Sequence, residues 1–245
     1  MSPSTDAPPE RNRLLAALPP ADYDALAPDL EDVALAHKEV LAVRGQPLSY
    51  VYFPRGAVGS ILVVMDDGQA VEGATIGDEG MLGLVAFLGD GISIDDAVCQ
   101  VTGRAARITV RAFRAACDRS GWLREVLHRY TLALMGQMTR TAGCNRVHPV
   151  EERLARWLLM THDRVGADEF ELTHEFIAAM LGVRRPSVTV AAGLLQQAGL
   201  IDYRRGRMRI LDRSQLEASA CEDYRLTRDI YDGLFAGLSS SASRD

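Results

Sequence analysis

The residues best suited to chemistry in this 245-residue sequence are arginines gathered near its C-terminal end. Seven lie between Leu172 and Arg213: Arg184, Arg185, Arg204, Arg205, Arg207, Arg209 and Arg213. Only three acids share the stretch, so it carries +4, whereas the whole chain carries −6 and the remainder therefore −10. Guanidinium groups donate paired hydrogen bonds to phosphate oxygens and guanine edges. A basic segment on an acidic chain is therefore suited to binding nucleic acid.

The pattern around these arginines predicts two short helices and a hairpin. Thr173 is a suitable N-cap for a helix ending at Leu181, and Gly182 can supply the left-handed residue that ends it. A second helix is expected from about Arg185, with an apolar inner side. Residues 203–211 read as a basic hairpin, or wing. Two helices joined by a glycine turn form a helix-turn-helix, whose second helix can enter the major groove.

Residues 32–109 have the pattern of many short strands. An Asp66–Gln69 turn, containing Gly68, separates two β-rich segments, and frequent glycines suit tight turns. This pattern predicts an antiparallel sandwich or roll, preceded by a short helical segment from Leu14 to about Leu30. Residues 1–13 are expected to form a disordered tail.

A long helix is predicted after the strands. Side chains recur at spacings of four and three: Leu123, Leu127, Tyr130, Leu134, Gln137 and Thr141. This heptad pattern is typical of a dimer seam. A helix packed on its own β-domain would show it too, but the length of the helix and its charged opposite edge favour the dimer. Pro149 is expected to mark the domain boundary.

The remaining residues give little support for catalysis or metal binding. The four cysteines are far apart. Cys144 and His148 have helical spacing suited to a shared metal or haem, but Pro149 interrupts the helix and no second ligand pair is evident. We therefore expect no metal, no cofactor and no enzyme activity. A cupin-like metal enzyme is a remote alternative, since only His37 is available between residues 31 and 112. The longest apolar stretch, Gly80–Gly89, is too short to span a membrane, so a cytoplasmic protein without membrane contact is expected.

The 172–211 run resembles the winged helix-turn-helix of the Crp/Fnr family of bacterial transcription regulators. LTHEFIAAMLGVRRP aligns with its turn-helix pattern, GDEGMLGLVAF (77–87) resembles its pocket-wall turn, and VEERLARWLLM (150–160) its post-hinge helix. The resemblance covers about 14–213. It implies an α+β fold with a jelly-roll β-roll like that of cyclic-nucleotide-binding domains (14–121), a dimerisation helix (122–146) and a DNA-binding domain (147–213). A C-terminal helical extension and tail would occupy 214–245.

The resemblance also implies roles for individual residues in binding double-stranded DNA. Arg185 matches the recognition-helix arginine that pairs with guanine, but Pro186 stands where the family often has glutamate, so the associated base preference does not carry over. Ser187 and Thr189 are further candidate base contacts. Candidate phosphate contacts are Thr173, His174, Arg184, Arg204, Arg205 and Arg207.

The signal-binding positions depart further from the family. The ribose position falls at Gly83 or Leu84, and the phosphate pair falls near Ser93 and Ile94. Asp95 and Asp96 follow directly and would repel an anion, so cAMP is not expected, and a small-molecule effector of another kind is a candidate partner whose need the sequence leaves open. The expected protein is a homodimeric regulator, with RNA polymerase as a further candidate partner. The alternative is a β-roll interaction or signalling protein that has lost specific DNA binding, which Pro186 would fit.

Overall fold

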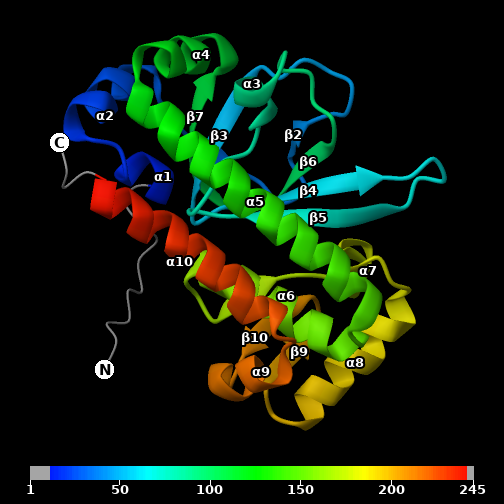
Figure 1. Cartoon of the computed structure of the whole chain (residues 1–245). Coiled ribbons are helices and arrows are strands. Elements are labelled where there is room, and N and C mark those ends of the chain that lie inside the picture. Colours follow the sequence, from blue (N-terminus) through cyan, green and yellow to red (C-terminus); the bar gives the residue numbers. More distant parts are fainter. Residues whose placement is uncertain (1–11, 242–245) are drawn as a thin grey trace.

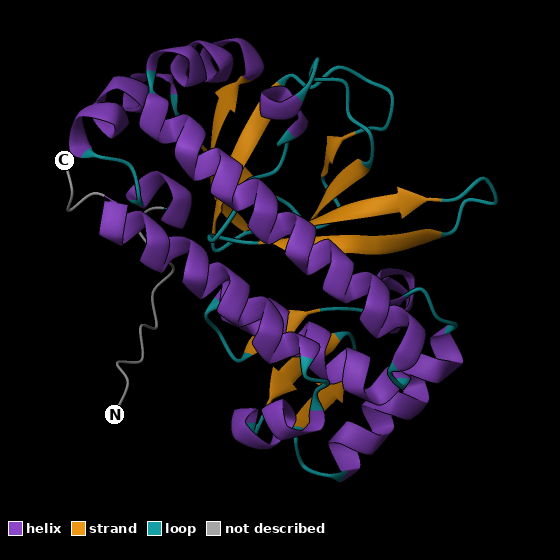
Figure 2. Ribbon diagram, viewed as in Figure 1, coloured by secondary structure: helices purple, strands orange, loops and turns teal. Residues whose placement is uncertain are grey.

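A computed structural model describes residues 12–241 of the chain. A β-roll occupies one end and a compact helical unit with a small sheet the other, and α5 (Gly121–Val147) runs diagonally between them (Figure 1). The last helix, α10 (Asp223–Ser241), runs along α5 (Figure 2). The fold is α+β, as predicted, with the β-roll, long helix and winged helix-turn-helix in the expected order.

Two antiparallel sheets form the roll. One has the order β1 (Glu31–Leu35), β7 (Gly103–Thr109), β3 (Tyr50–Arg55), and the other β2 (Val40–Ala42), β6 (Asp96–Val101), β4 (Val58–Val64), β5 (Ala70–Ile76). The predicted hairpin joins β4 to β5, and Gly68 adopts φ 82° in its turn. Val51, Phe53, Ile76 and Ile108 fill the core, and the short helix α3 (Val85–Leu88) adds the buried Ala86 to it.

The N-terminal segment belongs to the fold from Asn12 onward. Asn12 is fully buried: its side-chain amide donates to the carbonyls of Pro54 and Gly80, and its Oδ1 caps α1 (Arg13–Ala16). The predicted tail of residues 1–13 is therefore two residues too long, while residues 1–11 lie outside the described part. After α1 come α2 (Pro20–Leu26) and a 3-10 turn (Ala27–Asp29), which confirm the predicted helical start.

Helix α5 packs its predicted seam against its own chain. After α4 (Val110–Arg119), the Ser120 hydroxyl accepts from Leu123 N–H and so caps α5. All six residues of the proposed seam are buried: Leu123, Leu127, Tyr130, Leu134, Gln137 and Thr141. Tyr130 donates to the Met81 carbonyl and Gln137 to that of Thr75, both in the roll. The roll and the rest of the chain cover these six side chains, so they do not form the predicted dimer seam.

The C-terminal half begins with α6 (Val150–Val165), directly after Pro149. The remaining elements are β8 (Glu169–Glu171), α7 (His174–Leu181), α8 (Arg185–Gln197), β9 (Ile201–Arg204), β10 (Arg207–Ile210) and α9 (Arg213–Ser219). The three strands pair antiparallel in the order β8–β10–β9. Apolar side chains of α6, α7 and α8 form one core with Val58, Leu62 and Val101 of the roll.

Helix α10 covers a second side of α5. Tyr231 donates its hydroxyl to Gln137 Oε1, and Tyr231, Leu234 and Leu238 join the core that contains the roll and α5. Gly237 gives room to Arg129: a β-carbon at Gly237 would come within 2.5 Å of that guanidinium. Within residues 12–241, no helix is both long enough and apolar enough to cross a membrane.

Candidate DNA-binding surface and effector pocket

The turn between α7 and α8 is built as its sequence predicts. The Thr173 hydroxyl accepts from the Phe176 N–H and caps α7, and Gly182 ends that helix with φ 61°. Pro186 occupies the first turn of α8, where a missing N–H costs no hydrogen bond. Val188, Ala191, Ala192 and Leu195 face inward, so the opposite face of α8 is presented to solvent.

Arg185 is exposed at the start of α8, beside Arg184. An ion pair holds it, with 3.3 Å between its guanidinium and the Glu175 carboxylate, and both side chains are more than half exposed. An exposed pair of this kind contributes at most about 1 kcal/mol, so a base edge can compete with Glu175 for the arginine. Ser187 is half-buried on the same turn and Thr189 is exposed one turn on.

His174 does not have the position expected of a phosphate contact. Its ring stacks on Tyr203 at a centroid distance of 4.2 Å, its Nδ1 lies 3.1 Å from Thr189 Oγ1, and its Nε2 is buried. Burial and the nearby Arg185 charge lower the pKa of His174, which favours the neutral ring. This histidine therefore connects α7, α8 and β9 internally, and its predicted role as a phosphate contact does not fit.

The wing is a hairpin with a two-residue turn. Arg205 and Gly206 both have positive φ, 51° and 81°, as in turns that match the twist of antiparallel strands. Arg204 lies 3.1 Å from Asp202, and Arg207 lies 3.6 Å from Glu169 and 3.9 Å from Glu171. Sequence reasoning missed β8, because three residues, two of them glutamate, give no strand periodicity. Its acids reduce the positive charge of the wing at Arg207, whereas Arg205 projects at the tip.

The four predicted effector residues lie around one pocket in the roll. Gly83, Leu84, Ser93 and Ile94 line a cavity of about 170 Å³, together with Leu134 and Met138 of α5. Most of its lining is apolar, and its charged lining residues are Asp95 and Asp96. The Ser93 hydroxyl donates to the Asp95 carbonyl, so it is already engaged. This chemistry suits a small apolar or neutral ligand that touches α5.

Buried polar contacts join the roll to α6. Glu72 of β5 accepts from the Trp157 indole at 2.7 Å and from the Ser60 and Thr75 hydroxyls, and burial raises its pKa. Beyond β5, Glu79 forms an ion pair with Arg164 of α6 at 2.6 Å, and both side chains are buried. These contacts hold the helix-turn-helix unit in one orientation on the roll.

A β-roll with a pocket, a long helix and a winged helix-turn-helix define a two-domain architecture in which one domain has the form of a DNA-binding unit. Residues 152–219 match the model of the Crp-like helix-turn-helix domain. No curated protein matches the chain in sequence. Residues 152–219 therefore form a Crp-like helix-turn-helix domain, and the chain as a whole has the fold of Crp/Fnr-family regulators of solved structure.

Solved structures of the family share the fold at low sequence identity. A Crp/Fnr-family regulator from Eubacterium rectale is 18% identical, with a TM-score of 0.65 over 84% of this chain and 96% of that one. FixK2 from Bradyrhizobium japonicum is 17% identical, with a TM-score of 0.64 over 78% and 98%. A Crp-family regulator from Thermus thermophilus is 21% identical, with a TM-score of 0.62 over 77% and 96%.

Proposed function

We propose that the chain acts as a homodimeric, sequence-specific DNA-binding regulator that responds to a small neutral or apolar effector. The observation that carries the proposal is the outward face of α8, where Arg184, Arg185 and Thr189 are exposed above a packed inner face. Arg185 reads a guanine and Ser187 and Thr189 contact neighbouring bases, while Arg184, Arg204, Arg205 and Arg207 hold the phosphates. Thr173 supports them chiefly as the cap of α7.

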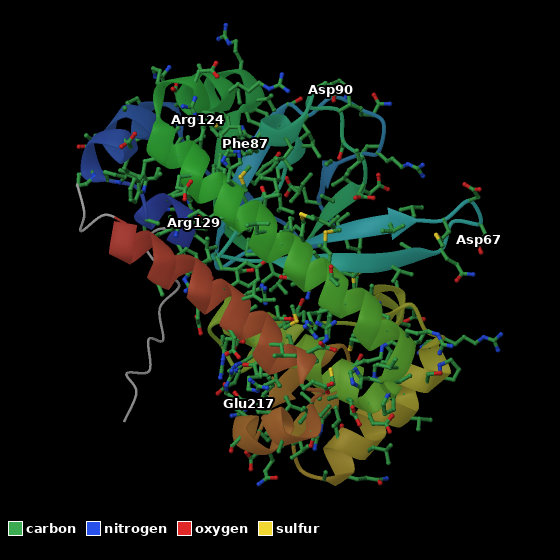
Figure 3. All side chains as sticks on the ribbon, in the orientation of Figure 1. Asp67, Phe87, Asp90, Arg124, Arg129 and Glu217 are labelled. Carbon is green, nitrogen blue, oxygen red and sulfur yellow. The ribbon has the colours of Figure 1, made fainter. Side chains whose placement is uncertain are left out.

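The dimer contact is assigned to the solvent-facing side of α5. Leu132 and Met135 are 70% and 58% exposed, and Thr139 and Ala142 continue the spacing of three and four residues along the same face. Figure 3 shows α5 at the front of the molecule, between the roll and α10, with Phe87 beside the upper half of the helix. The Phe87 ring is 5.0 Å from that of His128 on α5. An uncovered stripe of this kind fits a two-fold helix pair.

The effector is expected to act through this same helix. Leu134 and Met138 line the pocket from one side of α5, and Leu132 and Met135 are exposed on another. A ligand in the pocket therefore contacts the element that pairs the subunits. Asp95 and Asp96 disfavour an anionic ligand such as cAMP.

Selection of genomic fragments by the purified protein tests the proposal. The expected product is a palindromic site whose half-sites lie about 34 Å apart, as two recognition helices on a two-fold axis require. Sedimentation of the Met135→Glu variant should give a monomer with weakened binding, whereas Glu125→Gln, changed at the edge of α5, should stay dimeric. Absence of salt-sensitive binding at low ionic strength would instead favour the β-roll interaction protein.

A further inference from the structure

The junction of the two domains gathers four side chains that could ligate a metal ion. Cys144 lies in the last turn of α5 and His148 directly follows that helix, while Cys221 lies two residues before α10 and Asp223 is its first residue. One ligand atom from each lies within 4.8 Å of the other three. Three of the four residues are buried and His148 is half-buried. The ligands come from two short segments separated by 77 residues between the cysteines.

The spacing of the two sulfurs fits ligation. Cys144 Sγ and Cys221 Sγ are 3.4 Å apart. Two thiolates on a tetrahedral zinc ion lie about 3.8 Å apart, because each Zn–S bond is about 2.3 Å. A disulfide would require about 2.05 Å and would leave His148 and Asp223 without a part in the cluster.

His148 is oriented as a ligand would be. Its Nε2 lies 3.3 Å from the exposed Glu222 carboxylate, which can hold the ring proton on that nitrogen. Its Nδ1 is buried and makes no hydrogen bond to any described residue, with Asp223 Oδ2 at 3.5 Å. A histidine that donates one N–H to a carboxylate and directs the other nitrogen at a metal is a recurrent arrangement in zinc sites.

The surroundings compensate the charge of such a site. Two thiolates and one carboxylate carry three negative charges, and a divalent ion leaves one. Arg140 lies 3.6 Å from Asp223 Oδ1, whereas His148 approaches the other oxygen, Oδ2. The buried arginines Arg153 and Arg156 of α6 lie nearby, and the Nε of each makes no hydrogen bond within the described residues. Buried guanidinium groups in this number fit an anionic cluster rather than two neutral thiols.

We propose that Cys144, His148, Cys221 and Asp223 bind one zinc ion, which fastens the start of α10 to the junction between α5 and α6. Mixed sulfur, nitrogen and oxygen ligands in a closed set of four are typical of structural zinc. The site is distinct from the α8 surface and from the pocket in the roll, and it does not depend on DNA binding. Its effect would be to fix the orientation of the DNA-binding unit.

Metal titration of the reduced, chelator-treated full chain tests the site. With Co²⁺ as probe, we expect one equivalent per chain, with the absorption of tetrahedral cobalt and thiolate charge transfer, displaced by one equivalent of Zn²⁺. Cys144→Ser or Cys221→Ser alone should weaken the thiolate bands, and the double variant should abolish them. Cys117→Ser, a buried cysteine elsewhere, should leave them intact. Glu222→Gln should weaken affinity by about 10–100-fold.

The unmodified protein provides a measurement that does not depend on how the variants fold. One equivalent of Zn²⁺ should slow alkylation of Cys144 and Cys221, followed by mass spectrometry, without slowing that of Cys99 and Cys117. The proposal is overturned if the reduced protein takes up no metal, or if the bands survive in the Cys144→Ser/Cys221→Ser double variant. A Cys144–Cys221 disulfide in air, with no metal bound to the reduced protein, would also overturn it in favour of a redox pair.

Discussion

Arginine and glutamate form ion pairs both on the surface of α8 and in the contact between the roll and α6. The two pairs differ in how firmly they hold their members. On α8, the Arg185–Glu175 pair is exposed and holds its members weakly. Between the domains, the Arg164–Glu79 pair is buried at 2.6 Å, and Arg164 also donates to the Met160 carbonyl. An exposed ion pair contributes little free energy, so its members can exchange partners for a ligand. Removing one partner of a buried ion pair leaves an uncompensated charge and costs much more free energy. Changes at the two places should therefore separate binding from stability.

The largest effect is expected from Arg164→Met. It removes the partner of the buried Glu79 carboxylate and should lower the free energy of unfolding by about 3–5 kcal/mol. Urea unfolding measures the loss. The Glu79→Leu/Arg164→Met double variant should recover much of it, and a single variant as stable as the wild type would contradict the role assigned to the pair. The base preference of any folded Arg164→Met protein should be unchanged.

Arg185→Ala should have the complementary effect. It should weaken specific DNA binding by about 1–3 kcal/mol and relax preference at one base pair, because a bidentate guanine contact is lost. Unfolding free energy should change by less than about 0.5 kcal/mol, since the side chain is exposed. Binding to a set of single-base operator variants measures both quantities. Uniform weakening across the set would assign Arg185 to phosphate instead.

Arg205→Asn separates phosphate contacts from base contacts within the DNA-binding unit. Asparagine tolerates the positive φ of this turn, so the wing should keep its shape while losing one charge. Affinity should fall about equally for all sequences, and the salt dependence of binding should lose about one unit of slope. Titrations at several salt concentrations measure this. A changed base preference would show that the wing reads sequence.

The contact between the domains should also give the stability of the protein a dependence on pH. Burial, followed by the neighbouring Glu79 charge, raises the pKa of Asp78 from 3.8 to about 6. Between these values the folded chain holds a proton that the unfolded chain has released, so this group's contribution to stability falls as pH rises from about 4 to 6. Asp78→Asn should flatten that part of the stability curve, measured by urea unfolding at each pH. An unchanged slope would contradict the raised pKa.

The sequence could predict features that depend on interactions between residues close together in the chain. It could not predict those that depend on contacts between distant segments. The helix-turn-helix depends on local signals, such as the Thr173 cap and the Gly182 turn, and these were readable directly. The spacing of Leu123, Leu127 and Tyr130 showed a buried stripe but could not show what buries it. The roll and α10 cover it, and neither follows from periodicity in α5.

The junction shows the same limit more sharply. Cys144 and His148 read as an isolated pair, because Cys221 and Asp223 approach them only when α10 folds back along α5. Similarly, the stacking of His174 on Tyr203 joins elements whose contact depends on the wing. Contacts between segments that are far apart in the sequence cannot be predicted from the spacing of residues within either segment.

The packing of α10 along α5 affects the order in which the chain can fold. The residues of α10 leave the ribosome after those of α5 and the DNA-binding unit, yet they cover one side of α5. Domains generally fold in the order in which they emerge, so the roll and the DNA-binding unit can form while that side of α5 is still bare. A chain shortened before Cys221 would keep every residue assigned to DNA contact. Without α10, however, one side of α5 would stay uncovered and expose apolar surface to other chains.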